Sequence, residues 1–302
     1  MTDGARRPRR ASLCRCVLAL AAPTLSGAAI ANIFAVDGRD PRHYVTPGTA
    51  EARAFLPVSS VTADFTLRNL RAPGGVGSGE GTAFMVSPCY ALTAYHVLFG
   101  GGALTLNPMG NYPVTLRFGG DADGRPTLLV KGRVRFWGST GRTTPDVALI
   151  LLDGCPGRRI GWFDLTALDP APDTASGTAL VAMPGYAHDR SMRRLSLQPD
   201  CRIRAVLPTR GWLLHDCASR EGASGAPLLG RRGNRYVVVG VNAGEFDAQP
   251  AVQPTFTPTR ANWAIGADTL RATPRLSAMI ARDQQRAHTA NPLDRDTVAP
   301  PS

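Results

Sequence analysis

Three polar residues in this chain have the side-chain types needed to turn a hydroxyl group into a nucleophile. Ser224 lies between Gly222 and Gly225 in the stretch GASGAPLL, His96 lies in LTAYHV, and Asp146 lies in PDVALILL. A serine hydroxyl is a weak nucleophile until a neighbouring base accepts its proton and a third group orients that base. These residues can therefore supply covalent acyl-transfer chemistry, provided that the fold brings them together.

Each of the three residues has a plainer interpretation when it is taken alone. A serine flanked by glycines is common in tight turns, because glycine enters positive φ without a steric penalty. His96 follows an apolar segment and suits a partly buried structural histidine. Asp146 stands before a continuous apolar strand and suits a residue that caps its own loop. A buried carboxylate there is costly unless its hydrogen bonds are satisfied, and an imidazole N–H would satisfy one.

Short apolar or alternating segments, each bounded by turn residues, must position these side chains. Together with 32 Gly and 25 Pro, they predict an all-β protein built as an antiparallel sandwich or barrel. The segments fall into two clusters of about six, so we expect two antiparallel six-stranded β-barrels. The first series of segments covers 82–88, 90–97, 103–108, 113–120, 127–138 and 146–153. The second series covers 178–186, 194–207, 211–217, 226–230, 235–244 and 262–266. Two barrels facing one another leave a cleft, where we expect the chemistry.

The predicted domains follow from these two series. Residues 32–160 form an N-terminal segment and the first barrel, which carries His96 and Asp146, and residues 161–283 form the second barrel, which carries Ser224. A helix is predicted within 267–287, and Pro274 means that it begins after that residue or bends there. Residues 284–302 are polar and contain proline, so we expect a disordered tail.

The N-terminus has the pattern of a secretory signal peptide. A cationic segment at 6–10 precedes an apolar segment at 16–31, and Ala29 and Ala31 fit the small-residue rule for cleavage after Ala31. Cleavage after Ala35 is the second choice. The prediction is a signal peptide over 1–31 and a secreted or periplasmic protein.

A membrane anchor is the alternative for this segment, but it is short and is interrupted by Pro23 and Gly27. We therefore expect no stable membrane insertion after cleavage. Removing 1–31 takes away five Arg and one Asp and lowers the net charge from +11 to +7. No basic stripe is interleaved with aromatic residues, so nucleic-acid binding is not supported, although weak attraction to anionic surfaces remains open.

Four of the six cysteines remain after removal of the signal peptide, and an even number in an exported chain predicts two disulfides. None of their spacings is C-x-x-C, so no zinc site or other metal site is expected. Three pairings are possible from the sequence. The four residues are Cys89, Cys155, Cys201 and Cys217.

The segments LTAYHV, DVALILL and GASGAPLL resemble the three catalytic motifs of trypsin-like serine peptidases, which have the chymotrypsin fold. The bacterial secreted branch related to V8 and other glutamyl endopeptidases is the most similar. His96, Asp146 and Ser224 follow one another in that order with gaps of 50 and 78 residues, as in the chymotrypsin type. An α/β-hydrolase would need G-x-S-x-G with its serine first, which excludes that alternative. The resemblance runs from about Asn32 to Arg282.

The resemblance implies the roles of the site residues. His96 is the general base, Asp146 orients it, Ser224 is the nucleophile, and the N–H groups of Gly222 and Ser224 form the oxyanion hole. It also implies the disulfide pairing. Cys89 would pair with Cys155 to lock the strands of His96 and Asp146 together, and Cys201 would pair with Cys217 to stiffen the segment before Ser224.

The substrate-binding residues implied by the resemblance are Ala218, Ser219, Asn242, Ala243 and Gly244. Relatives that cut after glutamate carry a histidine where this chain has Asn242, so a strong preference for glutamate is not expected. Ala218 lacks the carboxylate that selects Arg or Lys.

Six further acidic or basic positions have alternative interpretations. Glu221 and Glu245 either favour basic side chains at the mouth of the pocket or are solvated loop charges. His215 and Asp216 form a rival pair close to Ser224, but we expect them to satisfy local backbone groups. Asp121 and Asp123 are similar to part of a calcium loop that lacks its other ligands, so we expect a turn.

The expected function is that of a secreted serine endopeptidase that forms an acyl-enzyme, needs no cofactor, acts on protein or peptide substrates and is monomeric. The alternative is a catalytically degenerate member that binds peptides or needs a partner for activity. A basic surface-binding protein is a third possibility, which depends on charge alone.

Overall fold

The computed structural model describes Met1 and residues 32–34, 38–65, 77–99, 113–139, 144–168, 179–247, 252–253, 255–287 and 290–294. Apart from Met1, the predicted signal peptide lies outside these residues, as do the segment 103–108 and the end of the predicted tail from 295. Among the described residues, no helix combines the length and the apolar character that a membrane crossing requires.

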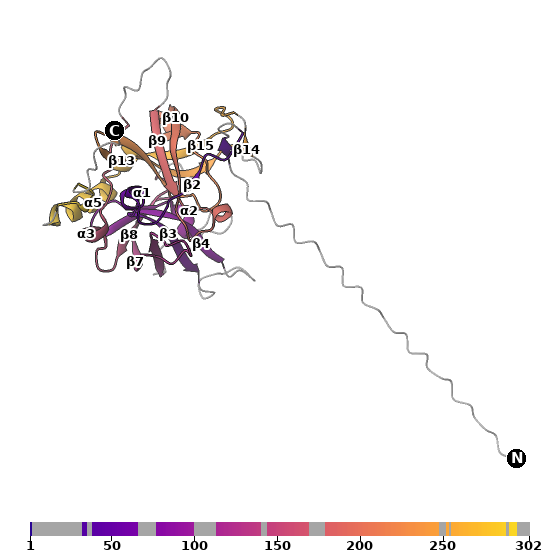
Figure 1. The fold of residues 1–302 in the computed structure, drawn as a ribbon, viewed down its shortest axis with the longest axis horizontal. Helices are drawn as coiled ribbons and strands as arrows, with labels where there is room; N and C mark the ends of the chain where they lie inside the picture. The colour runs from indigo at the N-terminus through magenta and orange to yellow at the C-terminus, as the bar shows by residue number, and fades with distance from the viewer. Residues whose placement is uncertain are drawn as a thin grey trace.

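The first barrel is a closed antiparallel sheet of six strands in the order β3-β4-β5-β8-β7-β6 (Figure 1). Its strands form because apolar residues alternate with polar ones, so that one face of each strand is buried. In β6, for example, Val114, Leu116 and Phe118 are buried, and the two residues between them are partly exposed. The strands are β3 (Val58–Phe65), β4 (Gly77–Met85), β5 (Tyr90–Thr93), β6 (Val114–Phe118), β7 (Leu128–Trp137) and β8 (Ala148–Leu152).

The second barrel contains six antiparallel strands in the order β11-β15-β13-β12-β9-β10, and pairing of β10 with β11 closes it. Its strands are β9 (Ala179–Gly185), β10 (Ser196–Leu207), β11 (Trp212–His215), β12 (Pro227–Arg232), β13 (Arg235–Glu245) and β15 (Asn262–Gly266). Two short N-terminal strands attach to this half of the molecule: β1 (Ile33–Phe34) pairs with β14 (Val252–Gln253), and β2 (His43–Tyr44) pairs with β10. The prediction of two six-stranded antiparallel barrels is confirmed.

Short helices connect the strands, and the longest helix follows the second barrel. The α-helices are α1 (Ala50–Ala54), α2 (Tyr95–Phe99), α3 (Gly157–Ile160), α4 (Ala267–Arg271) and α5 (Pro274–Arg286). The 3-10 turns are η2 (His188–Arg190), η3 (Pro208–Arg210) and η4 (Pro292–Asp294).

The predicted C-terminal helix is present, and Pro274 divides the predicted segment into two helices. Pro274 is the first residue of α5, a position where its missing N–H is not needed. Leu276 and Ile280, one turn apart, are the buried face of α5. Asp283 accepts hydrogen bonds from Ser87 Oγ and Cys89 N, both at 2.7 Å. The helix that follows the second barrel is therefore fastened to the first.

Residues 284–287 and 290–294 are more ordered than the sequence suggests. Residues 284–286 complete α5, and Asn291 Nδ2 donates to Trp162 O at 2.8 Å. This differs from the expectation of a tail without structure from residue 284. A single asparagine that pairs with a distant backbone carbonyl leaves no periodic pattern in the sequence.

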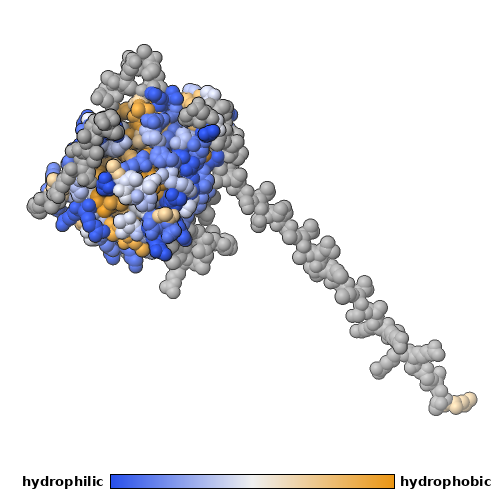
Figure 2. Space-filling model, viewed as in Figure 1, coloured by the Kyte–Doolittle hydropathy of each residue, from blue (hydrophilic) through white to orange (hydrophobic). Residues whose placement is uncertain are grey.

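The two barrels share an apolar core. One cluster of buried residues includes Phe84 and Leu149 from the first barrel, Leu229 and Val238 from the second, and Ile280 from α5. Close packing across this cluster fixes how the barrels meet. The face seen in Figure 2 is mostly hydrophilic, and hydrophobic areas show between the hydrophilic ones.

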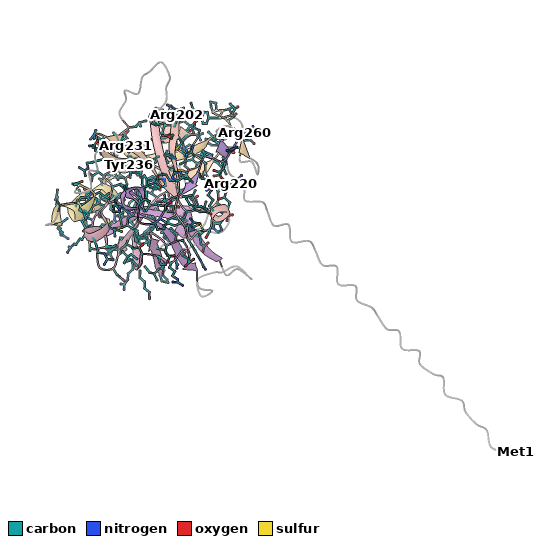
Figure 3. All side chains as sticks on the ribbon, viewed as in Figure 1. Met1, Arg202, Arg220, Arg231, Tyr236 and Arg260 are labelled. Carbon is teal, nitrogen blue, oxygen red and sulfur yellow. A yellow bond between two sulfur atoms is a disulfide. The ribbon has the colours of Figure 1, made fainter. Side chains whose placement is uncertain are left out.

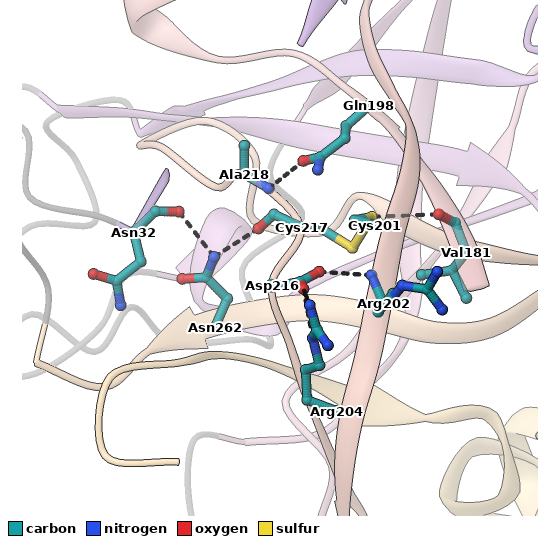
Figure 4. Close-up of a disulfide and its surroundings, with 10 residues drawn as sticks. All are labelled: Asn32, Val181, Gln198, Cys201, Arg202, Arg204, Asp216, Cys217, Ala218 and Asn262. Atoms are coloured by element: carbon teal, nitrogen blue, oxygen red, sulfur yellow. Dashed lines mark hydrogen bonds and ion pairs between the residues drawn. A yellow bond between two sulfur atoms is a disulfide. The ribbon is translucent and has the colours of Figure 1, made fainter. Parts of the chain in front are cut away.

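Both disulfides have the pairing that the family resemblance implies. Cys89 is bonded to Cys155, which joins the loop before β5 to the chain after β8, and Cys201 is bonded to Cys217, which joins β10 to the end of β11 (Figure 4). The bridges close loops of 66 and 16 residues. In the chain-entropy account such loops stabilise by about 4 and about 3 kcal/mol. Disulfides of this kind persist in oxidising compartments.

Candidate active site

His96 and Asp146 form a two-point hydrogen-bonded contact at the edge of the first barrel. His96 Nδ1 lies 2.8 Å from Asp146 Oδ2, and the backbone N–H of His96 donates to Asp146 Oδ1 at 3.1 Å. Asp146 is 7% exposed, and the imidazole remains 25% exposed. The carboxylate fixes the ring from one side and leaves its other edge available. Burial raises the pKa of the adjacent Tyr95 hydroxyl, and the charge of Asp146 raises it further.

The local chain explains why His96 can reach Asp146. Strands β5 and β8 are neighbours, with Thr93 opposite Ala148, so the residues that follow one and precede the other meet at the same barrel edge. His96 lies in the single turn of α2 and not at the end of a strand, because β5 ends at Thr93. The strand predicted over 90–97 is therefore shorter than expected.

Two successive turns shape the Ser224 loop. Ala223 N donates to Arg220 O at 2.8 Å, and Gly222, at the third position of that turn, has φ +94°. Ala226 N donates to Ala223 O at 3.0 Å, and Gly225, at the third position of the second turn, has φ +85°. Positive φ at the third position defines the type II turn, which requires glycine there. This accounts for both glycines that flank Ser224.

The Ser224 loop rests directly on the first barrel. Thr82 N donates to Ser224 O at 2.9 Å. A Cβ on Gly225 would collide with Thr82 O, and Ala94 N lies only 3.0 Å from that position. Ala94 is two residues before His96, so Ser224 lies beside the segment that carries the imidazole. The hydrogen bonds of the described residues include none between the Ser224 hydroxyl and His96.

The loop also presents two backbone N–H groups without partners. Within the described part of the chain, neither Gly222 N nor Ser224 N donates a hydrogen bond, although Ala223, Gly225 and Ala226 all do. Unused N–H groups on either side of one residue can bind an oxyanion, which is the role predicted for Gly222 and Ser224.

The predicted substrate-binding residues gather around the same loop, and most of them are buried. Ala218 N donates to Gln198 Oε1 at 2.6 Å. Asn242 Nδ2 donates to Ser219 Oγ and to Ala223 O, both at 3.0 Å. The amide of Asn242 therefore braces the Ser224 loop from β13, a structural contribution that the sequence does not predict.

Ala243 and Gly244 continue β13 beyond Asn242. Ala243 is 5% exposed, and Gly244 lies so close to the Trp263 indole that a Cβ would approach Nε1 to 2.7 Å. Burial raises the pKa of Glu245, the next residue, while the nearby His96 opposes the shift. β13 therefore contributes to both parts of the site: Asn242 supports the Ser224 loop, and Glu245 lies near His96.

Asn32 supports the site, although the sequence does not predict this role. It is fully buried, its carbonyl accepts from Ser219 N at 3.0 Å and from Asn262 Nδ2 at 2.9 Å, and its Nδ2 donates to Phe246 O at 2.8 Å (Figure 4). The one signal in the sequence is its place directly after the predicted cleavage point at Ala31.

Of the rival pair His215 and Asp216, only Asp216 has, within the described chain, the local hydrogen bonds that we predict for both. Asp216 accepts from Arg202 N and Arg204 Nε, both at 2.6 Å, which confirms its predicted local role (Figure 4). His215 is fully buried in β11, and burial lowers its pKa to about 3, although the Asn242 side chain and the Trp263 backbone oppose the shift. His215 is therefore a neutral core residue, and neither of its ring nitrogens has a well-aligned partner in the described structure.

Asp121 is a turn residue, as predicted. Its Oδ1 accepts from Asp123 N at 3.0 Å and from Arg125 N at 2.8 Å. No group of three or more metal-binding side chains occurs among the residues that the structure describes.

Comparison with known proteins agrees with this architecture. No family model and no curated sequence matches the chain. A solved glutamyl endopeptidase, crystallised in complex with MPD, is similar at 14% identity and a TM-score of 0.52, over 82% of this chain and 99% of that one. A thermostable serine protease, AL20, from an extremophilic microorganism is similar at 12% identity and a TM-score of 0.50, over 76% and 99%. The chain has the two-barrel, chymotrypsin-like fold of the trypsin-like serine peptidases.

Proposed function

We propose that the protein is a secreted serine endopeptidase that cleaves peptide bonds with Ser224, His96 and Asp146. The observation that carries this proposal is the pairing of His96 with Asp146 beside the Ser224 loop. In that loop, the N–H groups of Gly222 and Ser224 donate to no other described residue. A histidine and a turn with purely structural roles would not require a carboxylate that orients the imidazole next to unused backbone N–H groups. The fold of two serine peptidases at low identity supports the same reaction class.

The chemistry follows from the hydrogen bonds. Asp146 accepts a hydrogen bond from His96 Nδ1–H, which leaves the unprotonated Nε2 as the base. As Ser224 Oγ attacks the substrate carbonyl carbon, Nε2 takes the hydroxyl proton, and Asp146 stabilises the imidazolium. The carbonyl oxygen becomes an anion that the N–H groups of Gly222 and Ser224 bind. The imidazolium then gives its proton to the departing amine, and water hydrolyses the acyl-enzyme through the same base.

The surroundings of the site support a neutral P1 residue. Ala218 carries no charge, and the side-chain amide N–H groups of Asn242 are occupied by Ser219 and Ala223. Neither position offers a carboxylate to a basic side chain or an imidazolium to glutamate. The two disulfides support an extracellular or periplasmic location, and we propose that the protein acts there as a monomer after cleavage behind Ala31.

A peptide-binding protein without catalysis is the second candidate, favoured by the missing hydrogen bond between His96 and the Ser224 hydroxyl. Such bonds are often long in unliganded peptidases and tighten when substrate binds, so the geometry alone does not separate the candidates.

Labelling with a fluorophosphonate, together with hydrolysis of an unfolded protein substrate, separates them. The wild-type protein purified after export should be labelled and should cleave, whereas Ser224→Ala and His96→Ala should do neither. His43→Ala is the matched control, because His43 is a solvent-exposed histidine paired with Glu51. Peptide binding by an unlabelled, inactive wild type would reject the peptidase in favour of the second candidate.

A further inference from the structure

A buried arginine in the N-terminal segment is connected through Asp189 to the loop that carries Gly222 and Ser224. The Arg42 side chain is 4% exposed and contacts two carboxylates. Its Nε and Nη2 donate to Asp40 at 3.0 and 2.7 Å, and its Nη1 and Nη2 donate to Asp189 at 3.2 and 2.6 Å. Paired contacts of this kind exploit the planar guanidinium and are the strong form of ion pair.

Arg42 stabilises the ionised form of Asp40, and two further arginines lie close to the carboxylates of this cluster. Burial raises the pKa of Asp40, but the hydrogen bonds and charge of Arg42 outweigh it and hold that pKa at about 2. Arg190 Nη2 lies 3.2 Å from Asp40, and Arg220 Nε lies 3.9 Å from Asp189. Arg220, labelled in Figure 3, is the first residue of the turn that contains Gly222. The cluster therefore reaches the loop of the proposed nucleophile.

Asp189 belongs to η2, and η2 contacts the same turn through its backbone. His188 N donates to Glu221 O at 2.9 Å. A Cβ on Gly222 would meet Met192 Sδ at 2.6 Å and His188 Cδ2 at 3.0 Å, so the turn is packed closely against this segment.

The hydrogen bond from His188 sets the direction of the proposed oxyanion donor. The carbonyl of Glu221 and the N–H of Gly222 belong to one planar trans peptide, so they point in opposite directions. While Glu221 O is held toward η2, Gly222 N–H must point away from η2. Rotation of this peptide would convert the type II turn into a type I turn, which glycine also tolerates. The direction of the Gly222 N–H that suits oxyanion binding therefore depends on the position of η2.

We propose that Arg42 is a positioning residue, which holds η2 through Asp189 so that the Gly222 N–H stays directed at the oxyanion. The inference rests on the proposed function. It connects the N-terminal segment, which carries Arg42, to transition-state binding in the second barrel. Arg42 and Asp189 are 147 positions apart in the sequence. An N–H that acts only on the tetrahedral intermediate affects kcat and leaves substrate affinity unchanged.

Steady-state kinetics of Arg42→Gln, Arg42→Lys and Asp189→Asn tests the role in catalysis. We expect kcat to fall on the order of 10²-fold in Arg42→Gln, with KM changed less than about twofold, because one oxyanion donor contributes this much. Arg42→Lys should have a higher kcat than Arg42→Gln, because lysine keeps the positive charge but lacks the planar guanidinium that contacts both carboxylates. Asp189→Asn should lower kcat about tenfold; its side chain is 34% exposed, so this variant should fold even if Arg42→Gln does not. Unchanged kcat in folded Asp189→Asn and Arg42→Gln would overturn the inference.

Amide hydrogen exchange tests the same connection without relying on activity. Peptides covering 186–193 and 218–226 should exchange faster in Arg42→Gln and Asp189→Asn than in wild type. Arg231→Ala is the control, because it removes an exposed cation that contacts Tyr236 on another part of the second barrel (Figure 3). Unaltered exchange in both cluster variants would reject the positioning role, whereas an unlabelled wild type with altered exchange would reject only the peptidase.

Discussion

The carboxylate of Asp146 accepts hydrogen bonds from two donors on one residue, the backbone N–H and the Nδ1 of His96. The backbone contact fixes the position of His96 in the first turn of α2, and the ring contact fixes the tautomer. The orientation of His96 is therefore set by residues at the edge of the first barrel and does not depend on a bound substrate.

Asp146→Asn should abolish most activity without unfolding the protein. An asparagine of the same shape can donate to Nδ1, which would stabilise the wrong tautomer and leave Nε2 protonated. We expect kcat to fall by about 10³- to 10⁴-fold with KM nearly unchanged. Turnover of a chromogenic peptide measures this effect, and a loss of less than tenfold in a folded variant would show that Asp146 does not orient the base.

Gly222→Ala should disable the oxyanion hole by preventing the type II turn. Alanine disfavours φ near +94°, and its methyl group would approach Met192 and His188. We expect kcat to fall on the order of 10²-fold. Gly233→Ala is the matched control, since Gly233 also has positive φ, at +59°, but a Cβ there meets nothing within 4 Å. Equal losses of activity in both variants would indicate a general effect of strain and contradict the specific role of Gly222.

His215 should make the folded state sensitive to acid. Because burial lowers its folded pKa to about 3, the unfolded chain, with a histidine pKa of about 6.5, binds a proton first as the pH falls. The contribution of this residue to stability is therefore fully present above about pH 6.5 and declines from there toward pH 3. His215→Leu should flatten this decline in urea unfolding between pH 7.5 and pH 4.5, and the exposed His43→Leu should not. A decline of the same slope in His215→Leu would refute this assignment.

The sequence predicts most of the fold, because alternation of buried and exposed residues is a local property. Strands such as β6 and β8 follow from a few neighbouring residues, and two clusters of about six such strands fit two barrels. The end of β5 is harder to predict from the sequence, because a strand ends where its partner strands end, and β8 is distant in the chain.

Residues that position the candidate site are harder to predict than those that carry its chemistry. His96, Asp146 and Ser224 stand out by side-chain type and motif. Asn32 supports Ser219, and Arg42 reaches Asp189, only because the fold brings together residues that are more than a hundred positions apart. Asn32 stands out only by its place after the predicted cleavage point, and nothing in the local pattern around Arg42 distinguishes it from an ordinary polar residue.

The site of fluorophosphonate attachment tests the central claim most directly. Peptide mapping of the labelled wild-type protein should find the adduct on Ser224, and His96→Ala should remove it while the control His43→Ala retains it. An adduct on another residue, or full labelling of Ser224 in folded His96→Ala, would contradict the account.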